Sequence, residues 1–134
     1  MKHRSCVLAA FFGALLGAAP VWAHHSIQAE FYMDKQWSQT GVLTRIEWTN
    51  PHTITWVAVK DEQTGKVEEV GCQGSNPRGY SRAGLTPADW KIGDVVTITC
   101  SQARNGSKTW GFIRTLAYQS DGHVLFLGRR ARRY

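Results

Sequence analysis

Turn-forming residues interrupt this chain too often, between Thr40 and Leu127, for a long helix to form. The stretches between these interruptions are rich in β-branched and aromatic residues, or alternate between polar and apolar residues, as strands with two different faces do. The stretches are Thr40–Trp48, Thr53–Val59, Lys66–Cys72, Val95–Cys100, Thr109–Tyr118 and Val124–Leu127. The sequence therefore predicts a protein that is mainly β.

The first strand alternates most regularly. One face would carry Val42, Thr44, Ile46 and Trp48, and the other Leu43, Arg45 and Glu47. We expect Trp48, and Trp56 on the next strand, to be largely buried, because a small domain must fill its core with its largest apolar side chains.

The segment between the third and fourth strands, residues 74–93, differs from the rest. It contains two prolines and several glycines, with Thr86 and Pro87 placed as the N-cap and first residue of a short helix. Three strands, a short helical connector, two strands and a short sixth strand follow the order of an OB-type barrel, which closes its own edges. We predict a small OB-like barrel of five to six strands, with an open β-sandwich as the alternative.

Two cysteines, Cys72 and Cys100, lie at the ends of the third and fourth strands. In the OB order the fifth strand separates these two strands, which run in opposite directions. The cysteines would then lie at opposite rims, too far apart for a disulfide. We therefore expect no bond between them in this fold.

The first 23 residues have the features of a signal peptide. A basic start precedes the apolar run Val7–Ala19, and Val21-Trp22-Ala23 places small residues at the positions that signal peptidase requires. The run is too short to span a bilayer, although an uncleaved anchor is the alternative. We expect cleavage before His24, a periplasmic or secreted protein, and no membrane span after cleavage.

The remaining chain divides into an N-terminal extension (24–38), a β-barrel domain (39–127) and a basic tail (128–134). The formal net charge of +6 reflects 16 basic against 10 acidic residues. Six of the basic residues lie in the signal peptide or the tail, so the body between them carries ten of each and is neutral. A neutral, exported body predicts no binding to nucleic acid.

Histidines at the new N-terminus give the main chemical clue. Cleavage would leave His24 with a free amine beside its ring, His25 follows, and His52 lies in the first interstrand loop. Three nitrogens in one set suit Cu(II). We expect a site for copper or another transition metal at these three residues, although a solvated terminus and a loop-ordering His52 would explain them equally simply.

Four further residues near these histidines could support the site from a second layer or shape its loop: Glu30, Glu47, Trp48 and Asn50. The chain has none of the nucleophile-elbow, zinc-protease or phosphate-loop motifs, so we expect no enzyme. The tryptophans of the mature chain offer a different possibility, a stacking surface on the barrel.

Several segments resemble a family of exported bacterial proteins of unknown function, DUF6152. They are Ala23-His24-His25-Ser26, Ala29-Glu30-Phe31, Glu47–His52, Ile92–Ile98 and Asp121-Gly122. The resemblance implies a periplasmic, barrel-like protein, and it singles out His24, His25 and His52 as the family's motif histidines. The arginine tail, the two cysteines and His123 depart from that pattern.

Two functions remain open. One is a periplasmic metal-binding protein that uses the three histidines, with a copper-dependent oxidase as a weaker variant. The other is a metal-free module that binds a protein, peptide or glycan, including a periplasmic protein partner, through its barrel face and aromatic residues. Histidines brought together would favour the first, and tryptophans exposed on one face the second.

Overall fold

A computed structural model describes residues 26–128 and the backbone of residues 132 and 133. His24, His25 and the predicted signal peptide lie outside these described residues. The elements are α2 (Ile27–Glu30), β1 (Phe31–Glu47), β2 (Ile54–Lys60), β3 (Val67–Gln73), α3 (Pro77–Arg82), a 3-10 turn (Pro87–Asp89), β4 (Val95–Ala103), β5 (Trp110–Tyr118), β6 (Val124–Phe126) and β7 (Arg132–Arg133).

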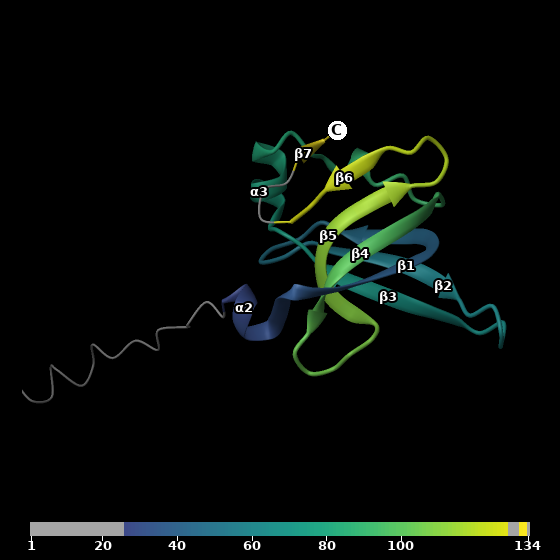
Figure 1. Cartoon of the computed structure of the whole chain (residues 1–134). Helices are drawn as coiled ribbons and strands as arrows, with labels where there is room; N and C mark the ends of the chain where they lie inside the picture. Colours follow the sequence, from purple (N-terminus) through teal and green to yellow (C-terminus); the bar gives the residue numbers. More distant parts are fainter. Residues whose placement is uncertain (1–25, 129–131, 134) are drawn as a thin grey trace, which may run out of the picture.

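Strands β1 to β5 form a closed barrel, and β6 continues the sheet beyond it (Figure 1). The order is β3-β2-β1-β4-β5, and neighbours in this order are antiparallel. The barrel closes where Gly71–Gln73 of β3 pairs in parallel with residues 110–112 of β5. These pairings confirm the mainly β, OB-like barrel with its helical connector between β3 and β4.

Strand β1 is longer and less regular than its sequence indicates. It begins at Phe31 rather than Thr40, inside the predicted extension, and its first half pairs with β4. Its second half pairs with β2 across an irregularity between Leu43 and Arg45. This bulge reverses the alternation, so that Leu43 is buried, while Val42, predicted to share a face with Ile46, is 42% exposed.

The connector contains a helix that the sequence analysis did not predict. Asn76 caps α3 by accepting a hydrogen bond from the backbone N–H of Gly79 at 2.7 Å. The predicted start at Thr86 is present, where the Asp89 carboxylate accepts the Thr86 backbone N–H at 2.7 Å, but it opens only a single 3-10 turn. In Figure 1, α3 lies near β6 and β7.

An aromatic cluster fills one end of the barrel. Trp48 packs against Tyr80 and Trp90, with ring centroids 5.8 and 5.6 Å away. The buried indole N–H of Trp90 donates to the hydroxyl of Thr55 at 2.9 Å, which leaves neither polar group unpaired. Trp48 is partly buried rather than fully buried, and it belongs to the core as predicted.

Cys72 and Cys100 form a disulfide, so the expectation that they lie at opposite rims is wrong. Their Cα atoms are 6.5 Å apart, and both side chains are fully buried. The predicted strand order is correct, but β3 overlaps β5 only through its last residues. The ends of β3 and β4 therefore meet on either side of Gly111, which has no side chain to separate them: a Cβ there would lie 2.7 Å from that of Cys100.

The basic tail contributes a short strand to the sheet. Arg132 and Arg133 form β7 and pair with Phe126 and Leu125 of β6. Residues 129–131 and 134 lie outside the described part of the chain. Within the described residues, no helix has the length and apolar character needed to cross a bilayer.

Candidate functional site

Four residues form one row across the outside of the barrel. The strand pairings place Arg45 of β1 beside Trp56 of β2, Trp56 beside Gly71 of β3, and Gly71 beside Trp110 of β5. Trp56 therefore faces outwards and is partly buried on the outside of the barrel, not in the core where its predicted burial placed it. Its neighbours Thr55 and Val57 point inwards instead and are buried. Both faces of β2 carry apolar residues, so its sequence does not indicate which face is buried.

Trp56 is held on both sides. Its indole lies over Gly71, and the Arg45 guanidinium stacks on it at 4.4 Å from the ring centroid. The indole N–H donates to Glu47 at 2.7 Å, and Arg45 also binds Glu69 at 2.8 and 3.0 Å. The hydrogen bond from Arg45 lowers the pKa of Glu69. Both faces of the Trp56 indole are thus in contact with protein, and Glu47, a predicted support for a metal site, is used to orient it.

Trp110 continues the row into a second apolar cluster. Its centroid is 6.1 Å from that of Trp56, and it packs against a group on the outside of the barrel. The buried members of this group are Phe31, Ala103 and Phe112, and the partly buried ones are Ile27 and Met33. The cluster joins α2 to the barrel, and Trp110 stands at its margin.

Arg104 fixes α2 to the turn that follows β4. Its backbone N–H donates to the carbonyl of Glu30, and its Nε donates to that of Gln28, both at 2.8 Å. Its guanidinium also stacks on Tyr32 at 4.3 Å from the ring centroid. These contacts bring residues 28–32 and 104, which are far apart in sequence, to one place on the surface.

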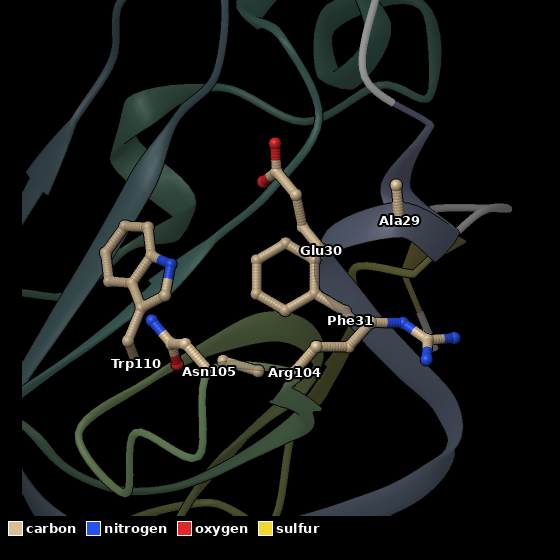
Figure 2. Close-up of a pocket in the computed structure, with 7 residues that line it drawn as sticks. Ala29, Glu30, Phe31, Arg104, Asn105 and Trp110 are labelled. Carbon is tan, nitrogen blue, oxygen red and sulfur yellow. The ribbon is translucent and has the colours of Figure 1, made fainter.

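A hollow of about 290 Å³ lies between these two segments. It is lined by Ala29, Glu30, Phe31, Ala103, Arg104, Asn105 and Trp110. Figure 2 shows the indole of Trp110 with its N–H edge toward the ring of Phe31, the Glu30 carboxylate above, and the Asn105 amide below, near the base of the Trp110 side chain. Phe31 is only 1% exposed and forms the floor, while the partly buried Trp110 forms a wall.

The polar groups at the hollow are oriented by local hydrogen bonds. The side-chain oxygen of Asn105 accepts the backbone N–H of Ser107 at 3.0 Å, which leaves the amide nitrogen on the side of Trp110 (Figure 2). Glu30 is exposed and supplies an acceptor, whereas the Arg104 guanidinium extends away toward Tyr32. The hollow therefore combines an aromatic wall with one carboxylate and one amide donor.

The predicted metal residues are only partly described. His52 is half-buried in the loop between β1 and β2, next to the exposed Asn50, which precedes a cis peptide bond to Pro51. Within the described residues no three of the side chains His, Cys, Asp and Glu form a group able to hold a metal ion. Of the predicted supporting residues, Trp48 belongs to the core and Glu30 lines the hollow.

A second, polar hollow of about 470 Å³ lies at the turn before β6. Lys91 and Asp121 form an ion pair at 2.9 Å across it, and the Lys91 hydrogen bond lowers the pKa of Asp121. His123 is half-buried, and its ring stacks on that of Tyr118 with centroids 6.3 Å apart. Because Lys91 and Asp121 already bind each other across this polar hollow, the hollow beside Trp110 is the stronger candidate site.

The fold and this hollow define a small OB-like barrel with an aromatic depression on its outer surface. The family model described as "Family of unknown function (DUF6152)" matches residues 14–112, and the chain belongs to this family. The match spans α2, the barrel to the start of β5, and the residues His24, His25 and His52, but Asp121-Gly122, part of the resemblance, lies beyond it. No curated protein and no solved structure matches the chain.

Sequence reasoning found Glu30 but assigned it to a metal site, and it did not find the hollow. Phe31, Asn105 and Trp110 carry no local signal, because the hollow exists only where the start of β1 meets the turn between β4 and β5. The Asn105-Gly106 pair is typical of a turn. The place of the Asn105 side chain at the hollow depends on α2, which no periodicity indicates.

Proposed function

We propose that this protein is an exported, non-enzymatic binding module that takes a saccharide unit in the hollow beside Trp110. The observation that supports this proposal is that one hollow is lined by the partly exposed indole of Trp110, the Glu30 carboxylate and the Asn105 amide. A sugar ring offers apolar C–H groups on its face and hydroxyl groups on its edge. The indole suits the first and the two polar side chains suit the second.

Position in the fold also supports this assignment. OB-type barrels bind oligosaccharides and oligonucleotides on the outer face around strands 2 and 3 and with the loops flanking it, an analogy at the level of the fold. Trp110 pairs with Gly71 on that side of the barrel, and Asn105 lies in the loop between β4 and β5. The neutral body of the chain favours a sugar over a polyanion.

Export is supported by two independent features. The N-terminal segment has the order of charge, apolar run and small residues of a signal peptide. The buried Cys72–Cys100 disulfide suits an oxidising compartment, because such bonds are rare in the reducing cytosol. We therefore place the module in the periplasm or outside the cell.

The test is a titration of the exported chain with soluble oligosaccharides: cellotriose, chitotriose and maltotriose. We expect at least one to shift the indole N–H resonance of Trp110 in a saturable way, and Trp110→Ala to weaken binding at least tenfold. Trp56→Phe is the matched control, since Trp56 lies on the same face but is covered by Arg45. Equal binding by the Trp110→Ala variant would overturn the assignment of the site.

Two further variants examine the polar groups. Glu30→Gln removes the charge, and Asn105→Asp keeps the acceptor for Ser107 while it removes the amide donor. Each variant should weaken binding of the same oligosaccharide several-fold without changing the melting temperature of the protein. If none of the three sugars shifts Trp110 at millimolar concentration, the saccharide assignment fails. A peptide shifting that resonance instead would keep the site and change its ligand class.

We retain a metal-binding role as a second candidate, because the family match includes His24, His25 and His52. The N-terminal amine and ring of His24, with a further imidazole, would give Cu(II) three nitrogens. One extra residue before His24 should remove this chelate while the barrel stays folded. Equal Cu(II) affinity with and without that residue would end the proposal.

A further inference from the structure

Strand β3 has one edge that is paired over only part of its length. Its pairing with β5 covers Gly71–Gln73, and among the described residues no strand pairs with this edge from Val67 to Val70. The backbone N–H of Gly71 donates to the carbonyl of Thr109, away from β2. Because backbone groups alternate between the two edges of a strand, those of Val67 and Glu69 also point to the unpaired edge.

Side chains at this edge are open to solvent. Val67 is 58% exposed, the highest value among the exposed large apolar residues, and it lies on the outer face with Glu69. Glu68 is exposed on the opposite face. A strand placed here would therefore meet an apolar side chain on one face and a carboxylate on the other.

Glu68 also restricts which strand can pair with this edge. If two copies of this chain paired these edges antiparallel about a two-fold axis through residue 68, their Glu68 side chains would be directly opposite, which is destabilising. Charges at an edge of this kind discourage self-association. They favour a strand of opposite charge, since a lysine or arginine opposite Glu68 would pair with it.

We propose that the edge at Val67 and Glu69 binds an extended segment of another polypeptide, one that alternates apolar and basic residues. The segment would add a strand to β3 in line with β5, through hydrogen bonds to the backbone groups of Val67 and Glu69. Its apolar residues would cover Val67, and a basic residue would face Glu68. This surface is separate from the hollow beside Trp110 and does not depend on the saccharide proposal.

The test uses the full exported chain labelled with nitrogen-15 and a blocked peptide with the sequence Lys-Val-Lys-Val-Lys. We expect the peptide to shift the amide resonances of Val67 and Glu69 and to slow their hydrogen exchange at least tenfold. The amides of Glu68 and Val70, which face β2, should change little. Absence of protection at Val67 and Glu69 under saturating peptide would overturn the proposal.

Val67→Pro removes the edge donor at residue 67 without removing a ladder bond to β2, and proline is tolerated at sheet edges. This variant should weaken binding of the peptide at least tenfold. Val67→Thr, the matched control, keeps the donor and should bind the peptide about as well as wild type does. Equal affinity of Val67→Pro and wild type, or of a peptide with glutamate in place of lysine, would contradict the proposal. Protection that grows with protein concentration without peptide would indicate pairing between copies and would also overturn it.

Discussion

The indole of Trp56 lies directly over Gly71, so that a Cβ atom at residue 71 would come within 2.6 Å of its ring. The two residues are directly opposite in the β2–β3 ladder, and Arg45 closes the other face of the indole. The ring therefore cannot move aside without losing its contact with Arg45 and its hydrogen bond to Glu47. This relationship makes glycine a steric requirement at residue 71.

Gly71→Ala should destabilise the protein by about 1–3 kcal/mol, because the added methyl group overpacks a filled site. Urea denaturation measures the free energy of unfolding. The variant Trp56→Ala removes the ring, and in that background Gly71→Ala should cost much less. If the two changes are additive in the double-mutant cycle, the indole is not the cause.

Loss of the Cys72–Cys100 disulfide should lower the free energy of unfolding by about 3.5 kcal/mol, from the entropy of closing a loop with a sequence separation of 28. The variant with both cysteines changed to alanine is compared with wild type in urea, with and without a reductant. The reductant should shift the wild-type midpoint and leave the alanine variant unchanged. A difference in the free energy of unfolding below about 1 kcal/mol between wild type and the alanine variant would show that the disulfide adds little to the stability of this barrel.

Thr55→Val should cost about 1–3 kcal/mol, because it leaves the buried indole N–H of Trp90 without an acceptor while keeping the shape of the side chain. Thr99→Val is the matched control. Thr99 shares a hydroxyl contact with Ser38 on the exposed surface, where water can replace the lost partner. Thermal denaturation of both variants should therefore show a large shift for the first and a small one for the second.

Stability should fall above pH 10 because of Tyr80. Burial raises the pKa of Tyr80 to about 12, above the value of about 10 expected in the unfolded chain. The folded protein therefore holds this proton where the unfolded chain has released it, and the free energy of unfolding decreases as pH rises through this window. The contribution is constant below pH 10 and falls by about 2–3 kcal/mol by pH 12.

Tyr80→Phe removes this group, so the difference between wild type and variant isolates its effect. Burial also raises the pKa of Tyr118, and that contribution remains in both proteins. Urea denaturation at pH 9 and pH 11.5 should show a larger loss for wild type than for Tyr80→Phe. Parallel losses in the two proteins would assign the alkaline effect to other groups.

Local pattern was enough to predict most strands and the barrel order. Residues 53–59, for example, are β-branched and aromatic, and β2 (Ile54–Lys60) forms there. The first half of β1 was missed because Phe31 packs on the outer cluster with Ala103, a partner that no local period reveals. The bulge after Leu43 changed which residues of β1 point inwards. Trp56 was placed on the wrong face for another reason: both faces of β2 carry apolar residues, so alternation does not indicate which face is buried.

Sites built from distant segments were not predictable in the same way. The disulfide depends on how far β3 overlaps β5, and the sequence indicates strand order but not stagger. The hollow depends on the contact between α2 and the turn after β4, where Arg104 binds the carbonyls of Gln28 and Glu30. Glu30 was noted only for its nearness to His24 and His25 in sequence.

The pairing of Phe31 with Ala103 has a consequence for how the barrel forms. The first half of β1 finds its partner only in β4, so its residues must wait until most of the chain is present. Contacts between such distant residues give a high contact order, which is associated with slow folding. A chain that emerges from its N-terminus cannot build this barrel progressively, and it must complete β1 after β4 has appeared.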